Sequence, residues 1–403
     1  MGEFFICPIC GNSDLRKVGY INGVPYCRAC ITFKGNDAKF LDRNNYESDY
    51  SISYSLTKNQ LDVSNKLLMN FKNKKDSLLI AVCGAGKTEI VFETISYVLK
   101  DGGRVGFTIP RRDVVIEIYN RLLSEQLLAA HHLAVLVHDL EIRLQNIFKD
   151  NKVIAVYGGH SKLVEGDIIC LTTHQLFRYK QYFDLLIIDE TDAFPFNGNE
   201  VLFNIMKRSL KGNLIMMSAT PSEEIKNNFT EENSIVYLNT RFHNHPLPVP
   251  KIVKRLLLFK YTFLIKKINE FISKNKPVFV FVPTIDLAEK VFYIINLFIK
   301  KGNIVHSKRE GREEIINDFR NGKYKFLITT AVLERGVTVK DLQVIVFNAD
   351  HDLYNKHVLV QIAGRVGRKV DAPDGEVIFI CEKDTDEIKK CIESINESNI
   401  FLR

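Results

Sequence analysis

A short glycine-rich segment constrains the fold of this chain more than any other feature. Residues 81–88 read AVCGAGKT, follow an apolar run and open a helical pattern. In this strand–loop–helix motif, glycines let main-chain amides curl around a phosphate, and the helix N-terminus adds positive charge. We expect Lys87 to reach the outer phosphates and Thr88 to hold Mg²⁺. The residues predicted to bind the nucleotide in this loop are Gly84, Ala85, Gly86, Lys87 and Thr88.

Two adjacent carboxylates follow a second apolar run. Leucines and isoleucines at 185–188 lead directly into Asp189 and Glu190, within the sequence DETD. We expect Asp189 to hold the magnesium shell and Glu190 to polarise the attacking water, because one carboxylate serves both tasks poorly. An acidic cluster after a strand is also typical of a helix cap. The presence of Lys87 favours a catalytic ATP site.

From residue 56 onward, short apolar runs alternate with longer amphipathic segments. This alternation predicts parallel sheets covered by helices, and thus two α/β domains in series. The predicted strands are 77–82, 104–109, 152–157, 167–171, 185–188, 214–217, 277–282, 303–306, 326–329, 344–347 and 376–380. A proline-rich stretch at 245–250 is interpreted as the hinge, which gives domains at 46–245 and 246–403. Residues 122–148 read as an amphipathic helix or helical pair to which the sequence assigns no role.

The first 45 residues contain two CxxC pairs, Cys7 with Cys10 and Cys27 with Cys30. Each such turn can place two sulfurs on one side of a metal, so the spacing predicts a structural Zn²⁺ site with four thiolate ligands. Paired redox thiols are the alternative, but they do not require a second copy of the motif. We expect a small zinc module at 1–45 that relies on the metal for stability.

Composition limits the class of protein. The chain has 403 residues, 46% of them hydrophobic, and a formal net charge of +7. This content excludes a disordered protein, and the mild basicity favours a polyanionic partner. An apolar run long enough to span a membrane and a signal peptide are both lacking, so the sequence predicts a cytoplasmic protein without a transmembrane segment of its own.

Beyond the phosphate loop and the acidic pair, the order of motifs across residues 56–403 resembles that of superfamily 2 helicases. The resemblance implies two tandem RecA-like parallel-sheet domains preceded by the zinc module. Gln60 is similar to the glutamine that contacts the nucleotide base, and residues 218–220 are similar to motif III. Arg365 and Arg368 match the two arginines of motif VI, which complete the nucleotide site from the opposite lobe. The same resemblance places Gln361 among the catalytic residues and Gly336 in the nucleotide site.

The resemblance also implies a DNA-binding face. Contacts to the phosphates of the strand would come from motifs Ia, Ib and V, with little sequence preference. The residues that match these motifs are Arg111, Arg112, Thr172, Thr173, Thr329 and Thr330. As alternatives, the threonines are ordinary strand residues and the arginines pair with neighbouring carboxylates.

More narrowly, the four-cysteine module joined to the sequence DETDAFP at 189–195 resembles the ComFA family, the competence helicase-like proteins of Gram-positive bacteria. That resemblance implies an ATPase stimulated by single-stranded DNA, which translocates along the strand during DNA uptake. It also implies ComFC and DprA as partners, and a position at the inner face of the membrane beside the DNA-uptake channel. Two alternatives stay open: a duplex-unwinding helicase of the PriA type, and a zinc-module scaffold with a vestigial ATPase.

Overall fold

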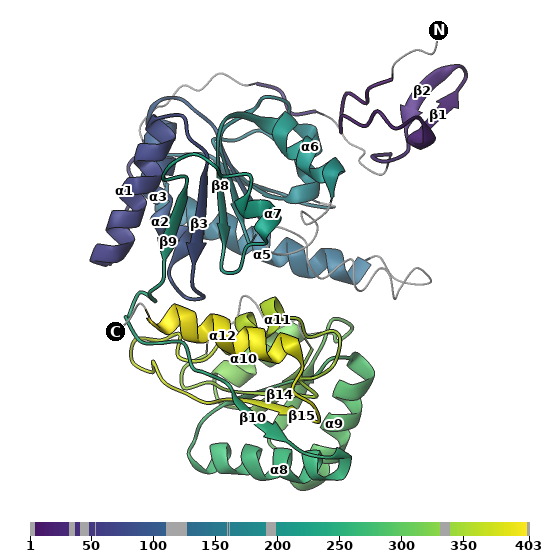
Figure 1. Cartoon of the computed structure of the whole chain (residues 1–403), viewed down its shortest axis with the longest axis vertical. Helices are drawn as coiled ribbons and strands as arrows, with labels where there is room; N and C mark the ends of the chain where they lie inside the picture. The colour runs from purple at the N-terminus through teal and green to yellow at the C-terminus, as the bar shows by residue number, and fades with distance from the viewer. Residues whose placement is uncertain are drawn as a thin grey trace. The chain divides into compact units, whose positions relative to one another are not determined.

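The computed structural model describes residues 5–31, 37–40, 48–52, 54–109, 127–158, 160, 162–190, 199–330 and 339–400. It contains two compact units (Figure 1). The first unit comprises Met1–Ala81 and Gly86–Leu238. The second comprises Val82–Ala85 and Asn239–Arg403, so it includes the first part of the phosphate loop.

A seven-stranded sheet forms the centre of the first unit, and all of its described strand pairs are parallel. Its strand order is β5-β6-β4-β7-β8-β3-β9. The strands are β3 (Ser77–Ala81), β4 (Val105–Ile109), β5 (Val153–Val156), β6 (Ile168–Thr172), β7 (Phe183–Asp189), β8 (Leu210–Ser218) and β9 (Ile235–Leu238). The six apolar runs predicted as strands in this half are confirmed. The prediction omitted β9, a short edge strand in which only alternate residues are buried.

Helices pack around this sheet. The first of them begins with a capping box, in which Thr57 and Gln60 each bond the other's main-chain amide. The helices are α1 (Lys58–Lys72), α2 (Lys87–Ile90), α3 (Phe92–Lys100), α5 (Leu127–Ile147), α6 (Glu200–Ser209) and α7 (Glu223–Lys226), with a 3₁₀ helix η2 at Thr173–Arg178. Within the predicted segment 122–148, the described part forms one continuous helix, α5.

The N-terminal module is a small hairpin beside a cysteine cluster. It contains a 3₁₀ turn η1 (Leu15–Lys17) and the antiparallel strands β1 (Val18–Ile21) and β2 (Val24–Cys27). Its four cysteines are buried in the same hydrophobic cluster as the core of the first unit. Gly11 faces α6, because a Cβ placed there would lie 3.5 Å from the side-chain nitrogen of Asn204. Further along, Ala38 N donates to the Arg178 carbonyl at 2.9 Å.

The second unit is built on a six-stranded sheet of order β10-β15-β14-β11-β13-β12, whose described pairs are again parallel. The strands are β10 (Lys251–Lys254), β11 (Val278–Phe281), β12 (Gly302–Val305), β13 (Phe326–Thr329), β14 (Gln343–Phe347) and β15 (Val377–Cys381). The helices are α8 (Leu257–Ser273), α9 (Ile285–Phe298), α10 (Arg312–Arg320), α11 (Lys356–Ala363) and α12 (Asp386–Ile400). Here too the predicted strands are confirmed, whereas the edge strand β10 was not predicted.

The segment after β9 is fixed to the second unit. Leu247 is buried, its amide donates to Asn399 Oδ1 at 2.8 Å, and its carbonyl accepts from Asn399 Nδ2 at 2.9 Å. The compact units therefore divide between Leu238 and Asn239, ahead of the proline-rich stretch. Within the described part of the chain, no helix is long and apolar enough to cross a membrane.

Candidate functional site

Three neighbouring strands of the first unit end at the sites that the sequence singled out. The strand order places β8 between β7 and β3. Asp189 on β7 aligns with Met217 on β8, and Ser218 aligns with Ile80 on β3. Because the strands are parallel, the phosphate loop after β3, the acidic pair after β7 and Ser218 meet at one edge of the sheet.

The phosphate loop uses its glycines for backbone conformation. Gly84 has a φ of 82° and Gly86 a φ of 78°, in the left-handed region that side chains disfavour. A Cβ at Gly86 would also lie 2.6 Å from Gln60 Nε2. Gly86 is the N-cap of α2, so Lys87 is the first residue of that helix. The loop therefore has the backbone form that an anion-binding turn requires.

Lys87 and the first acidic residue face each other. Lys87 Nζ lies 3.8 Å from Asp189 Oδ1, and their side chains are 14% and 22% exposed. Glu190 follows with a φ of 58°, so the chain turns sharply directly after the strand. Thr88 and Asp189 offer oxygen atoms, the ligands that Mg²⁺ prefers. The donors present thus fit a nucleotide-bound magnesium ion held by Thr88 and Asp189.

Gln60 lies beside this loop. It is 5% exposed, and its Oε1 accepts a hydrogen bond from the Thr57 amide at 2.9 Å. The carboxamide nitrogen is the group that approaches Gly86. This location agrees with a residue of the nucleotide site, but its contact with a base stays a prediction.

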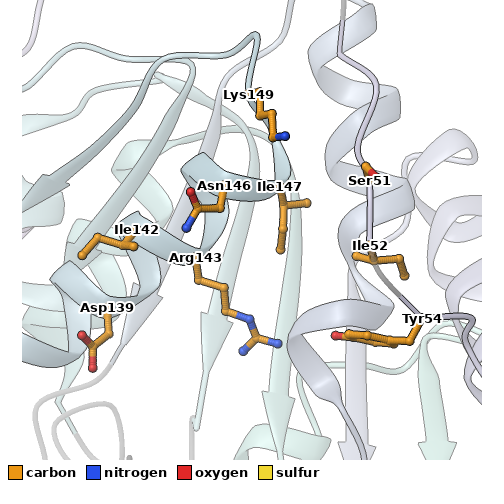
Figure 2. Close-up of a pocket in the computed structure, with 9 residues that line it drawn as sticks. All are labelled: Ser51, Ile52, Tyr54, Asp139, Ile142, Arg143, Asn146, Ile147 and Lys149. Atoms are coloured by element: carbon orange, nitrogen blue, oxygen red, sulfur yellow. The ribbon is translucent and has the colours of Figure 1, made fainter.

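A pocket of about 620 Å³ lies next to the phosphate-loop helix, between α5 and the side chains of Ser51, Ile52 and Tyr54 (Figure 2). Tyr54 and Arg143 line it, and both reach Glu89 of α2: the tyrosine hydroxyl donates at 2.9 Å, and the guanidinium forms an ion pair. Burial and the nearby Glu89 carboxylate raise the pKa of Tyr54. The sequence left α5 without a role, and the structure shows that its second half forms one wall of this pocket.

The motif VI residues of the second unit lie on α11 and the turn that follows. Gln361 is on the helix and is 6% exposed, and Arg365 is 1% exposed. Arg368 Nε donates to the Gly364 carbonyl at 2.9 Å, within the turn that follows the helix. Their action on a nucleotide stays a prediction.

The four threonines proposed to grip DNA are largely buried. Exposed fractions are 5% for Thr172, 0% for Thr173, 0% for Thr329 and 8% for Thr330. The Thr173 hydroxyl donates to the Ile109 carbonyl at 3.5 Å, and the Thr329 hydroxyl donates to the Thr330 carbonyl at 3.0 Å. Their role in DNA binding stays a prediction. Arg111, Arg112, Gly336, the rest of the DETDAFP segment and most of motif V lie outside the described residues.

The four N-terminal cysteines form a cluster with the geometry of a metal site. All four sulfurs lie within 4.8 Å of one another, and all four residues are buried. The Cys7–Cys30 sulfurs are 3.5 Å apart and the Cys10–Cys27 sulfurs 3.6 Å apart. Tetrahedral Zn²⁺ with thiolate bonds of about 2.3 Å separates its sulfurs by about 3.8 Å. The donor set therefore fits Zn²⁺, and these two sulfur separations are close to the spacing that the ion requires.

One buried residue near the nucleotide-site motifs was not predicted. Arg241 is 1% exposed, and its guanidinium donates to main-chain carbonyls at Cys83 and at Gly364, Val366 and Gly367. No sequence motif surrounds it, since it follows an edge strand and precedes a proline-rich stretch. Only the fold brings it to these carbonyls.

Comparisons with known families and structures agree with this arrangement. Residues 57–228 match the DEAD/DEAH box helicase family, and residues 260–370 match the helicase conserved C-terminal domain. Saccharomyces cerevisiae Dbp5 bound to RNA and ADP BeF3 superposes with a TM-score of 0.59 at 16% identity, covering 86% of this chain and 92% of Dbp5. RecG bound to a three-way DNA junction gives a TM-score of 0.54 at 16% identity, covering 87% of this chain and 45% of RecG. These likenesses confirm the two RecA-like domains of a superfamily 2 ATP-hydrolysing helicase or translocase.

Two full-length relatives narrow the family. Competence protein ComFA of Bacillus subtilis (strain 168) is 32% identical over 417 residues, covering 98% of this chain and 85% of the relative. Competence protein ComFA of Streptococcus pneumoniae (strain ATCC BAA-255 / R6) is 32% identical over 416 residues, covering 99% and 91%. With its helicase domains, its phosphate-loop edge and its four-cysteine cluster, the chain belongs to the ComFA family of superfamily 2 helicases.

Proposed function

We propose that this chain is a single-stranded-DNA-dependent ATPase that translocates along DNA and drives the uptake of transforming DNA during competence. The observation that carries the proposal is the approach of Lys87 Nζ to Asp189 Oδ1, 3.8 Å apart at the strand ends of a helicase fold. Relatives that are 32% identical over nearly the whole chain are named competence proteins. An intact ATP site in this family argues against a vestigial ATPase.

Each residue of the proposed site has its own task in ATP hydrolysis. Lys87 binds the outer phosphates, and its charge offsets the charge that develops on them. Glu190 accepts a proton from the attacking water, while Asp189 and Thr88 hold the magnesium ion. When bound, Mg²⁺ neutralises negative charge on the phosphates. Arg365 and Arg368, with Gln361, stabilise the transferring phosphoryl group, since a planar guanidinium matches its oxygens.

Contacts with the strand are proposed to go to its phosphates. The hydroxyls of Thr173 and Thr329 donate to main-chain carbonyls. Main-chain amides near these strand ends are therefore better placed to donate to the phosphates of the strand. Arg111 and Arg112 would add charge. Binding through phosphates carries little sequence information, which suits a protein that moves along any strand. Zn²⁺ in the cysteine cluster is proposed to be structural, and contacts with ComFC, DprA and the uptake channel stay predictions.

Glu190→Gln is expected to lower kcat for ATP by about a hundredfold or more, because the amide keeps the shape of the carboxylate but loses its basicity. The affinity for ATP should change by less than about threefold, since Lys87 and the loop remain. Phosphate release and fluorescent-nucleotide binding measure the two quantities. Glu224→Gln, at an exposed position on α7, is the matched control. Undiminished turnover in Glu190→Gln would remove Glu190 from the catalytic site.

Single-stranded DNA is expected to stimulate ATP turnover more than duplex DNA or RNA of the same length. The three nucleic acids are compared side by side at equal nucleotide concentration. Affinity for the single strand should fall at least about tenfold between about 50 and about 200 mM salt, because phosphate contacts release counterions. A strong preference for RNA, or an affinity for single-stranded DNA that does not change with salt concentration, would contradict the proposed substrate.

A further inference from the structure

Arg241 is one of the largest fully buried side chains among the described residues. Four hydrogen bonds hold its guanidinium, all to main-chain carbonyls of the second unit. Nε donates to Cys83 O at 3.3 Å and Nη1 to Gly367 O at 2.9 Å, while Nη2 donates to Gly364 O at 3.1 Å and to Val366 O at 2.8 Å. A guanidinium has five N–H groups in a fixed plane, more donors than any other side chain offers.

Burying this charge carries a cost. Burial, followed by the positive charge of Arg368, lowers the pKa of Arg241 to about 10. The side chain is still protonated at neutral pH, so it places a charge in a dry environment. Helix α11 ends at Ala363, and Gly364 is its C-cap. The guanidinium therefore lies beside the C-terminal end of α11, the negative end of the helix dipole, which favours a cation and offsets part of the cost.

The carbonyls that Arg241 holds belong to the turn that carries the motif VI arginines. Gly364 O accepts from both Arg241 and Arg368, so the two guanidinium groups share one acceptor. The turn depends on Gly367, whose φ is 67° and where a Cβ would lie 1.9 Å from the Pro373 carbonyl. His243, two residues after Arg241, places Nε2 2.9 Å from Gly367 O and holds the same turn.

The same guanidinium also holds the start of the phosphate loop. Cys83 O is one of its four acceptors, and Cys83 packs directly on the turn, since a Cβ at Gly364 would lie 2.6 Å from the Cys83 Cβ. Gly84 follows, and a Cβ there would lie 3.6 Å from Arg241 Nε. One buried side chain thus fixes both the backbone that leads to Gly84 and the backbone that carries Arg365 and Arg368.

We propose that Arg241 is a positioning residue for ATP hydrolysis. It fixes the motif VI turn and the first residues of the phosphate loop, and thereby sets the positions of Arg365 and Arg368. The inference rests on the proposed ATPase function, which it extends. A displacement of about 1 Å in a group that stabilises the transition state is enough to cost about a hundredfold in rate. A merely structural arginine would instead affect only stability.

Arg241→Gln and Arg241→Lys test the proposal, with Arg255→Gln, an exposed arginine of the same unit, as the matched control. Glutamine removes the charge, while lysine keeps it but cannot donate to four carbonyls in one plane. We expect kcat to fall at least about tenfold in Arg241→Gln, with ATP affinity changed less than about threefold. Arg241→Lys should lie between Arg241→Gln and the wild type. Turnover, nucleotide binding and thermal melting are measured on the full chain.

A kcat in a folded Arg241→Gln within about twofold of wild type would overturn the proposal, as would a loss confined to melting temperature. Should Arg241→Gln not fold, Arg241→Lys decides: lowered kcat with retained nucleotide affinity supports the proposal, and wild-type kcat overturns it. Lys87→Ala is assayed in parallel. If its turnover equals that of the wild type, the ATPase assignment itself fails; if it is inactive while the Arg241 variants hydrolyse normally, only the positioning role fails.

Discussion

Replacing Lys87 with alanine is expected to lower ATP turnover at least about a hundredfold while the protein remains folded. Lys87 is the first residue of α2, and its ammonium lies 3.8 Å from Asp189 Oδ1 at the edge of the sheet. The side chain is partly exposed, at 14%, and its ammonium faces the Asp189 carboxylate. What is lost is a positive charge at the place where the loop and the helix N-terminus favour phosphate.

Steady-state phosphate release in the presence of single-stranded DNA measures this effect, and a thermal melt reports the fold. Lys66→Ala is the matched control, because Lys66 is exposed on α1 of the same unit. Both variants should melt close to the wild type. Wild-type turnover in Lys87→Ala would mean that residues 81–88 do not form the catalytic phosphate loop. The assignment of the ATP site would then be wrong.

The catalytic edge could be predicted from sequence because its determinants are local. A phosphate loop needs glycines at positions of positive φ, and Gly84 and Gly86 have that conformation. The apolar run before Asp189 predicted a strand that ends at the carboxylate, and β7 ends there. Parallel strands bring their carboxyl ends together, so two motifs that each follow such a strand can meet at one edge of the sheet.

Features that depend on distant residues could not be predicted in this way. Arg241 is an ordinary arginine in the sequence, and its acceptors lie at 83 and 364–367. The edge strands β9 and β10 are four residues each and carry exposed positions, so they lack the continuous apolar run of a central strand. The burial of Thr173 and Thr329 likewise follows from packing, which a motif does not specify.

The contact between α5 and the phosphate-loop helix α2 also depends on residues that are distant in the sequence. Arg143 pairs with Glu89, which also accepts from Tyr54. The three residues come from three separate segments of the chain, and each alone resembles a solvated polar residue. Only their convergence beside one pocket gives α5 a location relative to the candidate ATP site.

Cys27→Ser is expected to release the bound zinc and to destabilise the first unit as well as the N-terminal module. A serine hydroxyl is a poor replacement for a thiolate, and structural zinc sites contribute directly to folding. The cysteine cluster belongs to the same hydrophobic cluster as Leu202 and Met206 of α6. Loss of the metal should therefore loosen the packing of the module on α6 and lower the melting temperature by at least about 5 °C.

Zinc content per chain and thermal melting are measured together, and limited proteolysis locates the loosened segment. Cys391→Ala, a buried cysteine of the second unit outside the cluster, should keep its zinc even where it lowers stability. An unchanged zinc content in Cys27→Ser would refute the four-thiolate site. Lost zinc with an unchanged melting temperature would instead mean that the module packs on α6 without stabilising it. Because Asn204 of α6 faces Gly11 of the module, an Asn204→Trp substitution should separate these effects: zinc stays bound while the contact is disturbed. The four sulfurs lie within the module itself, so metal binding does not require the contact with α6.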